Sequence, residues 1–229
     1  MRIAEIFYSI QGEGKLAGVP SAFVRVSGCN LRCTWCDTPY ASWAPEGPDL
    51  PVDRIVQQTI AFGARHVVVT GGEPMTMPQI ASLCDALAAA RMHITIETAA
   101  TVFSLVKMNL ASLSPKLANS TPRDRDGGRL AAAHERQRLN VPVIQQFIDH
   151  APEFQLKFVV SSQEDVAQID AILGQIRGWT PADVLLMPEG IDAATLRDRA
   201  TWIVQVCKQR SWRYCPRLHV ELFGHQRGT

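Results

Sequence analysis

Three cysteines stand within eight residues of one another, a grouping that favours a metal centre over disulfides. Cys29, Cys33 and Cys36 follow the spacing C-x3-C-x2-C, so their thiolates belong to one short loop. A structural zinc ion takes a closed set of four ligands, and no fourth cysteine or histidine stands nearby. A cubane iron–sulfur cluster normally takes four cysteines. Three cysteines would therefore leave one iron open to another ligand.

A zinc site completed by a distant histidine or by a second copy of the chain is the alternative interpretation. His66 is the histidine nearest to the cysteines in sequence. A triple-cysteine spacing is more specific than a single C-x2-C pair, which favours the cluster. Cys84, Cys207 and Cys215 are expected to be small apolar side chains or free thiols.

A glycine-rich segment, Gly71-Gly72-Glu73-Pro74, directly follows the apolar run His66–Thr70. Two glycines after a strand allow a ligand to approach the backbone closely. The carboxylate of Glu73 can accept hydrogen bonds from a bound ammonium group. Alone, such a segment is no more than a turn, but here it stands one predicted strand–helix unit after the cysteines.

Short apolar runs alternate with helical patterns along the chain. The predicted strands are Ala22–Val26, His66–Thr70, His93–Glu97, Asn109–Leu113, Leu156–Val160, Asp183–Met187 and Arg217–Leu222. The predicted helices are Val52–Phe62, Thr76–Arg91, Val102–Lys107, Glu164–Ile176 and Ala193–Arg210, with a capping box at Thr76 and an N-cap at Asp192. Such alternation favours parallel βαβ units. It predicts an α/β fold, an incomplete βα barrel, with an open sheet as the alternative.

These elements place the unusual residues at one edge of the predicted sheet. The cysteines follow the strand Ala22–Val26, Glu97 ends another strand, and Ser114-Pro115-Lys116 follows a third. In parallel α/β folds the loops after the carboxyl ends of the strands build the functional site. No change in composition marks a second domain, so residues 1–229 are expected to form a single domain.

The composition excludes several classes of protein. Lys and Arg number 23 against 22 Asp and Glu, so the net charge of +1 predicts no basic footprint for nucleic acid or anionic membrane. The longest apolar runs, such as Val184–Met187, are too short to span a bilayer. An acidic residue, Glu5, stands where a secretory signal needs apolar residues. A cytoplasmic location with reduced thiols is therefore expected.

The cysteine spacing resembles that of the radical S-adenosylmethionine (SAM) superfamily. In that superfamily the open iron binds the amino and carboxylate groups of SAM, and a low-potential cluster cleaves SAM to a 5′-deoxyadenosyl radical. The cofactor supplies this chemistry, while the protein orients it and excludes side reactions. The segment Gly71–Pro74 looks like the superfamily's methionine-binding segment.

A closer resemblance, to the 7-carboxy-7-deazaguanine synthase family, runs from about Glu5 to Gly224. It is carried, in chain order, by Gln11-Gly12-Glu13-Gly14, Arg25 with Gly28-Cys29-Asn30, Cys36-Asp37-Thr38, Ser114-Pro115-Lys116 and Arg217-Leu218-His219-Val220. The resemblance implies an incomplete (β/α)6 radical-SAM barrel with an extra C-terminal strand. It also implies a Mg²⁺-assisted radical ring contraction of 6-carboxy-5,6,7,8-tetrahydropterin, with loss of ammonia, in queuosine and 7-deazapurine biosynthesis.

The resemblance assigns roles to matching residues. It assigns a 4Fe–4S cluster to Cys29, Cys33 and Cys36, and Mg²⁺ to the hydroxyl of Thr38. It assigns SAM to Gly72, Glu73, Glu97, Ser114 and Lys116. It assigns the substrate to Gln11, Glu13, Arg25, Thr70 and His219. No side chain is assigned as catalytic, because the radical derives from SAM.

The residue types suit a carboxylated pterin. The carboxylate of Glu13 accepts only, and can take the paired N–H donors of the pyrimidine edge. The guanidinium of Arg25 forks onto carboxylates, and Thr38 offers the oxygen ligand that Mg²⁺ prefers. Taken singly, Glu13 could be a solvated charge, Arg25 part of a surface ion pair and Thr38 the start of a turn. His219 could be a satisfied core imidazole.

Two segments depart from the family pattern. Ala99-Ala100 stands where the family often has Asn-Gly or Ala-Gly, so a backbone role that needs glycine at position 100 does not carry over. Met187-Pro188 stands where some relatives have Gln-Pro, which removes a polar contact to the ribose or adenine.

The family further implies a flavodoxin- or ferredoxin-like electron donor and a homodimer. Within the superfamily, the alternative is an activase that draws hydrogen from a glycine of a partner protein. Outside it, the alternative is a non-enzymatic zinc or iron–sulfur protein. The set Glu13, Arg25 and Thr38 discriminates, because a macromolecular substrate would not need it.

Overall fold

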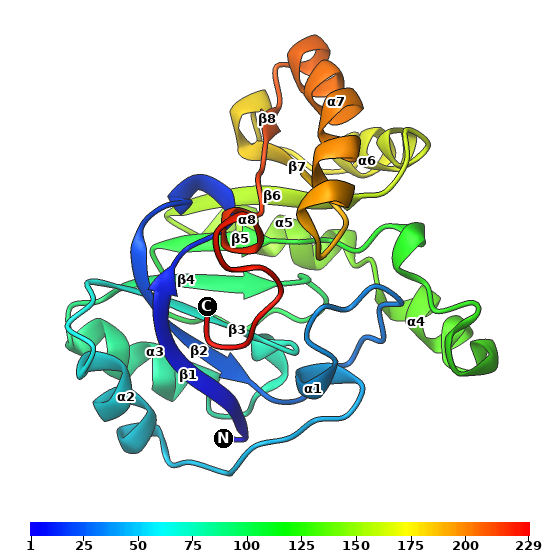
Figure 1. Cartoon of the computed structure of the whole chain (residues 1–229). Helices are drawn as coiled ribbons and strands as arrows, with labels where there is room; N and C mark the ends of the chain where they lie inside the picture. Colours follow the sequence, from blue (N-terminus) through cyan, green and yellow to red (C-terminus); the bar gives the residue numbers. More distant parts are fainter.

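Eight strands stand side by side in sequence order in the computed structural model, which describes residues 1–229 (Figure 1). They are β1 (Ile3–Ile10), β2 (Pro20–Val26), β3 (His66–Gly71), β4 (His93–Thr98), β5 (Leu110–Leu113), β6 (Glu153–Val160), β7 (Val184–Pro188) and β8 (Arg213–Tyr214). β1 is antiparallel to β2, and every later neighbouring pair is parallel. β1 and β8 lie at opposite edges, so the barrel is incomplete, as the sequence predicts.

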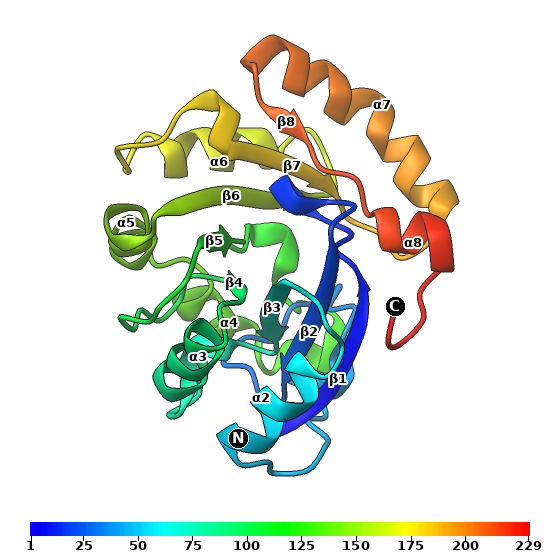
Figure 2. The ribbon, with the colours of Figure 1, turned by 90° about the vertical axis from the view of Figure 1, so that its left-hand side faces the viewer.

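The longer helices cover the convex side of the curled sheet (Figure 2). The helices are α1 (Pro39–Ser42), α2 (Val52–Ile60), α3 (Ile80–Ala89), α4 (Ala131–Gln137), α5 (Val141–His150), α6 (Asp165–Leu173), α7 (Ala193–Arg210) and α8 (Leu218–Phe223). The main hydrophobic core lies between these helices and the sheet, and Phe147 of α5 and Phe158 of β6 are among its largest fully buried side chains. Figure 2 also shows α8 and the C-terminal segment on the opposite, inner side.

Strand periodicity decides which side chains face the core and which face the inside of the barrel. Successive residues of a strand point to opposite faces. In β3, Val67 and Val69 belong to the core, whereas Val68 and Thr70 line the inner cavity. In β6, Phe158 belongs to the core and Lys157 lines the cavity. The inner face of the sheet therefore carries polar side chains, which a strand with both faces in an apolar core would lack.

The long helix α7 confirms its prediction at both ends. It spans Ala193–Arg210, and the carboxylate of Asp192 accepts a hydrogen bond from the backbone N–H of Thr195 at 2.9 Å. An N-cap of this kind satisfies one of the free N–H groups of the first turn. Local signals were sufficient here because both the cap and the helix are continuous in sequence.

The predicted strand Arg217–Leu222 is wrong, because this segment forms α8. The extra C-terminal strand does exist, but it is β8, four residues before Arg217. The side chain of Arg217 is buried and anchored by ion pairs to Glu13 and Asp37, and the backbone N–H of Leu218 donates to Gly12 O at 2.9 Å. These long-range contacts turn a short apolar–polar alternation into a helix.

Other differences fall where local patterns were weak. Val102–Lys107 is not helical; Val102, Phe103 and Val106 pack against the core from an irregular segment, whereas Leu105 is exposed. The hydroxyl of Thr76 donates to Glu73 O instead of capping a helix, since α3 begins only at Ile80 after a second proline, Pro78. No element predicted from the sequence corresponds to β1, α1, α4 or α5.

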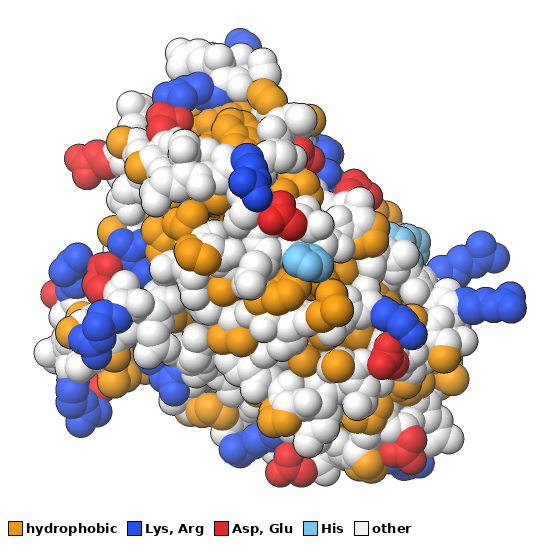
Figure 3. Space-filling view, turned by 180° about the vertical axis from the view of Figure 1, so that it is seen from behind, with side chains coloured by type: hydrophobic (Ala, Val, Ile, Leu, Met, Phe, Trp, Pro, Cys, Tyr) orange, Lys and Arg blue, Asp and Glu red, His pale blue; other side chains and the backbone are white.

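The back of the molecule carries acidic and basic side chains mixed with apolar ones (Figure 3). On this face no continuous basic patch is seen, which agrees with the net charge of +1. None of the helices combines the length and the apolar composition that a bilayer crossing requires.

Candidate active site

A cavity of about 270 Å³ opens on the inner side of the barrel, and its walls unite segments from both ends of the chain. Every site residue predicted from the sequence lines it except Glu73. These residues are Gln11, Glu13, Arg25, Cys29, Cys33, Cys36, Thr38, Thr70, Gly72, Glu97, Ser114, Lys116 and His219. The parallel topology explains this gathering, because the loops after successive strands meet at one edge of the sheet.

The three cysteines lie in an irregular loop between β2 and α1. Burial raises the pKa of the Cys29 and Cys33 thiols to about 12. The Sγ of Cys36 lies 3.1 Å from the Ser42 hydroxyl oxygen. No three His, Cys, Asp or Glu side chains of the structure are grouped as one metal ion requires. Three thiols of one loop line the same cavity, which is one fewer than the four ligands of a structural zinc and leaves one iron of a cubane cluster open.

Gly72 lies where three backbone segments meet beneath the cavity. A Cβ on Gly72 would lie 1.9 Å from Gly28 O and 2.6 Å from Ala41 O. The backbone N–H of Gly72 donates to Val26 O at 3.0 Å, and that of Gly28 donates to Ala41 O at 2.8 Å. Glycine is therefore required here by the packing of β3 against the cysteine loop, in addition to any approach of a ligand.

Replacing Gly72 with alanine is expected to destabilise the fold by about 3 kcal/mol, because the new methyl group overlaps backbone oxygens that cannot move independently. Denaturant unfolding of the cluster-free protein measures this change. Gly174→Ala is the control: its Cβ would meet only Asp170 O and Ala171 O, at 3.4 and 3.9 Å. Equal stability of the two variants would contradict the packing role of Gly72.

Glu73 lies below the cavity instead of facing it. Its side chain is 0% exposed, and its carboxylate accepts hydrogen bonds from the Thr98 hydroxyl at 2.6 Å and from the backbone N–H groups of Ala99 at 2.8 Å and Met75 at 3.1 Å. Burial raises the pKa of Glu73, although these three donors oppose the rise. Internal donors thus occupy the carboxylate that was predicted to accept from a ligand ammonium, and Glu73 instead orients the segment after β4.

That segment includes Ala100, one of the positions where the sequence departs from the family pattern. Ala100 is buried and adopts a φ of 55°, in the left-handed region that favours glycine. Its backbone N–H donates to the Thr98 hydroxyl oxygen at 3.0 Å. The left-handed turn is therefore kept here without glycine, and the hydrogen bonds to Glu73 and Thr98 hold it.

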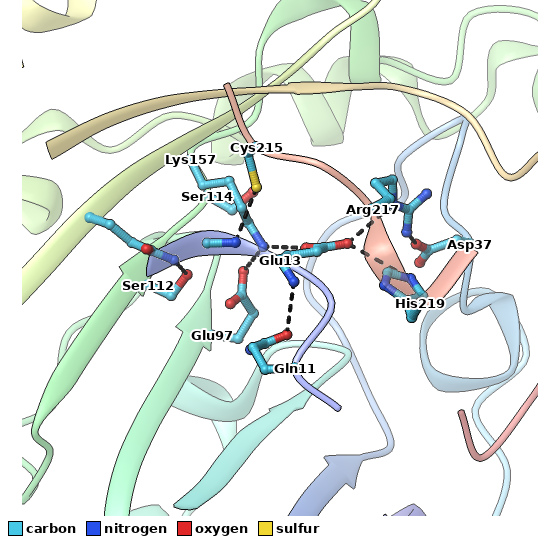
Figure 4. Close-up of polar contacts among 12 residues, drawn as sticks. Gln11, Glu13, Asp37, Glu97, Ser112, Ser114, Lys157, Cys215, Arg217 and His219 are labelled. Carbon is cyan, nitrogen blue, oxygen red and sulfur yellow. Dashed lines mark hydrogen bonds and ion pairs between the residues drawn. The ribbon is translucent and has the colours of Figure 1, made fainter. Parts of the chain in front are cut away.

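A buried ionic network occupies the centre of the cavity (Figure 4). The Nζ of Lys157 lies 2.5 Å from Glu13 Oε2 and also pairs with Glu97. The Lys157 side chain is 3% exposed. Burial alone lowers the pKa of Lys157, but the two carboxylates raise it more, so the ammonium stays charged. One buried cation therefore joins a predicted substrate residue to a predicted SAM residue.

The second oxygen of Glu13 faces another set of groups. Arg217 Nε donates to Glu13 Oε1 at 3.1 Å, and the same guanidinium pairs with Asp37. His219 Nε2 lies 4.0 Å from Glu13 Oε1. Burial raises the pKa of Glu13, but the combined effect of Lys157, Arg217 and His219 is larger and of opposite sign. The pKa of Glu13 is therefore strongly lowered. Glu13 is thus held ionised, with lone pairs left to accept further donors.

Helix α8 brings His219 into the cavity against the loop that carries Glu13. A Cβ on Gly12 would lie 2.0 Å from His219 Nδ1, so only glycine leaves room for the ring. Burial lowers the pKa of His219, with Arg217 and Lys157 lowering it further while Glu13 and Asp37 oppose. His219 is therefore a cavity residue, placed by a helix where the sequence predicted a strand.

Arg25 is engaged by an acidic neighbour on β1. Its Nε donates to Glu5 Oε1 at 2.6 Å, and the same oxygen accepts from the Tyr40 hydroxyl at 2.5 Å. The ion pair that the sequence left as an alternative thus exists, but its arginine side chain is 18% exposed and lines the cavity. Only Nε is used, so both terminal nitrogens of Arg25 remain free to fork onto a carboxylate.

The remaining predicted residues hold simpler positions on the wall. Lys116 Nζ donates to the hydroxyl and carbonyl oxygens of Ser114 at 2.7 and 2.9 Å. Gln11 Oε1 accepts from the backbone N–H of Glu13 at 3.2 Å. The Thr38 hydroxyl lies 3.8 Å from Cys36 Sγ and precedes α1. Thr70 faces Arg25 across the β2–β3 pair.

Lys157, Glu5 and Asp37 line the cavity but were not among the predicted site residues. Lys157 left a signal, since it is the one charged residue in the apolar run Leu156–Val160. A charge in such a strand needs a buried partner. Asp37 stands in the motif Cys36-Asp37-Thr38, but its pairing with Arg217 depends on the fold. Glu5 left no signal, because its role depends on Arg25, which only the fold brings to it.

Comparison with known proteins agrees with this architecture. The radical SAM superfamily model matches residues 23–123, which include the cysteine loop, β3 and β4. The crystal structure of QueE from Escherichia coli has a TM-score of 0.69 at 26% identity and covers 93% of this chain and 92% of that chain. The fold, the cysteine loop and the superfamily match define a radical SAM enzyme, a class that uses a 4Fe–4S cluster and SAM.

The sequence is 45% identical over 227 residues to the 7-carboxy-7-deazaguanine synthase of Rhodopirellula baltica, covering 99% of this chain and 88% of that protein. It is 43% identical over 232 residues to the enzyme of the same name from Halobacterium salinarum, covering 97% and 90%. The chain belongs to the 7-carboxy-7-deazaguanine synthase family. This relationship excludes both the activase and the non-enzymatic alternative.

Proposed function

We propose that the protein converts 6-carboxy-5,6,7,8-tetrahydropterin into 7-carboxy-7-deazaguanine by radical ring contraction with loss of ammonia. The observation that carries this proposal is the meeting, in one cavity, of the cysteine loop with Arg25 and Glu13. Arg25 provides a guanidinium whose two terminal nitrogens are free, and Glu13 provides an ionised carboxylate. A carboxylated pterin requires both groups, one for its carboxylate and one for its N–H donors. The relatives named above carry the name of this activity.

Cys29, Cys33 and Cys36 would hold the cluster, and Gly72, Glu97, Ser114 and Lys116 would surround SAM. When bound, the cluster and SAM supply the 5′-deoxyadenosyl radical. The protein's contribution is to bind, to orient and to exclude water. Glu73 supports this site from below, through Thr98 and Ala99.

On the substrate side, the terminal nitrogens of Arg25 bind the 6-carboxylate, and Glu13 accepts the N–H donors of the pyrimidine edge. Lys157 and Arg217 keep Glu13 ionised and fixed, so the carboxylate needs little reorganisation when the substrate binds. Gln11, Thr70 and His219 complete the wall. Arg25 lies on β2, directly before the cysteine loop, and this supports a substrate orientation with the carboxylated carbon on the side where the radical forms.

The proposal includes Mg²⁺ bound through the Thr38 hydroxyl, an oxygen ligand of the kind this ion prefers. It includes a flavodoxin- or ferredoxin-like electron donor, because the cluster must be reduced from outside. It also includes a homodimer of single-domain subunits.

Anaerobic reconstitution of the cluster, followed by electron paramagnetic resonance of the reduced protein with and without SAM, tests the first part. We expect a reduced 4Fe–4S signal that shifts when SAM is added. The second part is tested by adding the pterin and measuring 7-carboxy-7-deazaguanine, with and without Mg²⁺. A reconstituted protein that cleaves SAM but leaves the pterin unchanged would contradict the proposed substrate.

A further inference from the structure

The backbone on both sides of Cys33 is held by residues about a hundred positions later in the chain. The N–H of Arg32 donates to His134 Nδ1 at 3.1 Å. The N–H of Thr34 donates to Ser120 O at 2.8 Å. These two amides flank the central cysteine of the loop, and both acceptors come from the segment between β5 and the end of α4.

The two acceptors are themselves joined. His134 Nε2 lies 2.9 Å from the Ser120 hydroxyl oxygen, and this hydroxyl donates to Leu117 O at 2.6 Å. Because Nδ1 accepts from an amide and the hydroxyl proton is used on Leu117, Nε2 must carry the ring proton and donate it to Ser120. His134 is 3% exposed, and burial lowers its pKa to about 4, which agrees with a neutral ring.

The backbone N–H groups of the loop make few hydrogen bonds within it. The N–H of Cys36 donates to Cys33 O at 3.3 Å, and the N–H of Leu31 donates to Cys29 Sγ at 3.3 Å. The guanidinium of Arg32 also donates to the carbonyl oxygens of Cys29 and Leu31, at 2.6 and 2.7 Å. From outside, Trp43 Nε1 donates to Cys33 O at 3.0 Å. The backbone on either side of Cys33 is therefore held from outside the loop by His134, Ser120 and Trp43. Arg125 adds a hydrogen bond to Thr34 O at 3.0 Å.

We propose that His134 and Ser120 form a clamp that positions Cys33 for cluster binding. The inference rests on the assignment of the cysteines to a cluster in the proposed function. Groups that orient ligands from behind contribute to metal affinity although they never touch the metal. The clamp also directs the amides of Arg32 and Thr34 to His134 and Ser120, and so withholds them from the thiolate sulfurs.

The test compares reconstituted native protein with His134→Leu and His134→Asn. Leucine cannot accept a hydrogen bond, whereas the Oδ1 of asparagine can lie near the position of Nδ1. His150→Leu is the matched control, since this histidine lies exposed on α5, hydrogen-bonds to Gln146 O and contacts the Phe103 ring, with no contact to the cysteine loop. The measurements are iron loss to a chelator and the reduction potential of the cluster.

We expect His134→Leu to lose iron roughly tenfold faster than the native protein, with His134→Asn restoring most of the difference. We also expect a less negative potential in His134→Leu, because freed amides can donate to the sulfurs and stabilise the reduced cluster. A native protein and His134→Leu with equal iron loss and equal potential would overturn the clamp. If iron loss is equally fast in His134→Leu and His134→Asn, His134 has only a packing role, and this result would also overturn the clamp.

Hydrogen exchange of the cluster-free native protein keeps the inference testable if His134→Leu does not fold. The amides of Arg32 and Thr34 should exchange slowly, and rapid exchange of both would contradict the clamp. Failure of the proposed function gives a different result: the native protein would assemble no cluster, while the two amides would still be protected.

Discussion

Replacing Lys157 with methionine is expected to lower turnover of 6-carboxytetrahydropterin by roughly 10²- to 10³-fold, since removing one partner of a buried ion pair leaves an uncompensated charge. Lys157 is the cation between Glu13 and Glu97. Without it, the two carboxylates face each other inside the cavity. Methionine keeps the volume of the side chain, so the loss reports on the charge. Steady-state kinetics with saturating SAM measures it.

The pH profile of this variant separates charge from packing. In the native protein Lys157 and Arg217 keep the pKa of Glu13 far below neutrality, so Glu13 is ionised at every working pH. In Lys157→Met the pKa of Glu13 should rise, and protonation removes its ability to accept two N–H donors. Residual kcat/KM should therefore increase as the pH is raised from 6 to 8, where the native enzyme shows no such dependence on Glu13.

Two controls accompany the Lys157 variant. Lys157→Arg keeps the charge and should keep the native pH profile even if the rate falls. Lys107→Met removes an exposed lysine that pairs only with exposed Asp85, and should leave turnover unchanged. If Lys157→Met shows nearly native turnover and pH profile, Lys157 is not the group that keeps Glu13 ionised.

Replacing Arg25 with alanine is expected to lower kcat/KM for the carboxylated pterin by roughly 10²-fold or more, the scale for losing one partner of a desolvated charged pair. The free terminal nitrogens of Arg25 are the groups proposed to bind the 6-carboxylate. Lysine should rescue poorly, because a single ammonium cannot form the two parallel hydrogen bonds. Competitive binding of pterins with and without the carboxylate measures the specific part of the effect.

The decisive comparison uses the tetrahydropterin that lacks the carboxylate. Arg25→Ala should weaken binding of the carboxylated compound and leave binding of the other nearly unchanged. Equal losses for both would assign Arg25 to the structure of the Glu5–Tyr40 cluster instead of to the substrate. Glu5→Gln, which keeps a hydrogen-bond acceptor for Arg25, should fall between Arg25→Ala and the native protein.

Much of the sheet was predictable, because a buried parallel strand is a local property. The runs at β2, β3, β4, β5, β6 and β7 are short and rich in apolar residues, and nothing outside them is needed to recognise a strand. The same holds for α7, whose cap and helix are adjacent in sequence. The antiparallel β1 was missed because its burial is uneven and its partner β2 is not visible from its own residues.

The site divides in the same way. The spacing of Cys29, Cys33 and Cys36 identifies them as ligands, and the family pattern identifies Arg25 and Glu13. The chemistry of these residues was therefore predictable from the sequence. The orientation of Glu73 was not predictable, since Thr98 and Ala99 at the end of β4, together with the N–H of Met75, hold its carboxylate away from the cavity. A motif identifies a residue, but the hydrogen-bond partners of its side chain decide whether that side chain faces the cavity.

By itself, then, the sequence determined the alternation of strands and helices, the cysteine loop and the family of this enzyme. Each of these is recognised from short segments whose residues are adjacent in the chain. The tertiary structure decided that Lys157 bridges Glu13 and Glu97, that Arg217 starts a helix and that His134 supports Cys33. Each of these depends on a buried charge or polar group that finds its partner far away in the chain. Lys157 and Glu13 are 144 positions apart, and Arg32 and His134 are 102 positions apart. Burial makes such partners obligatory, and only folding selects them.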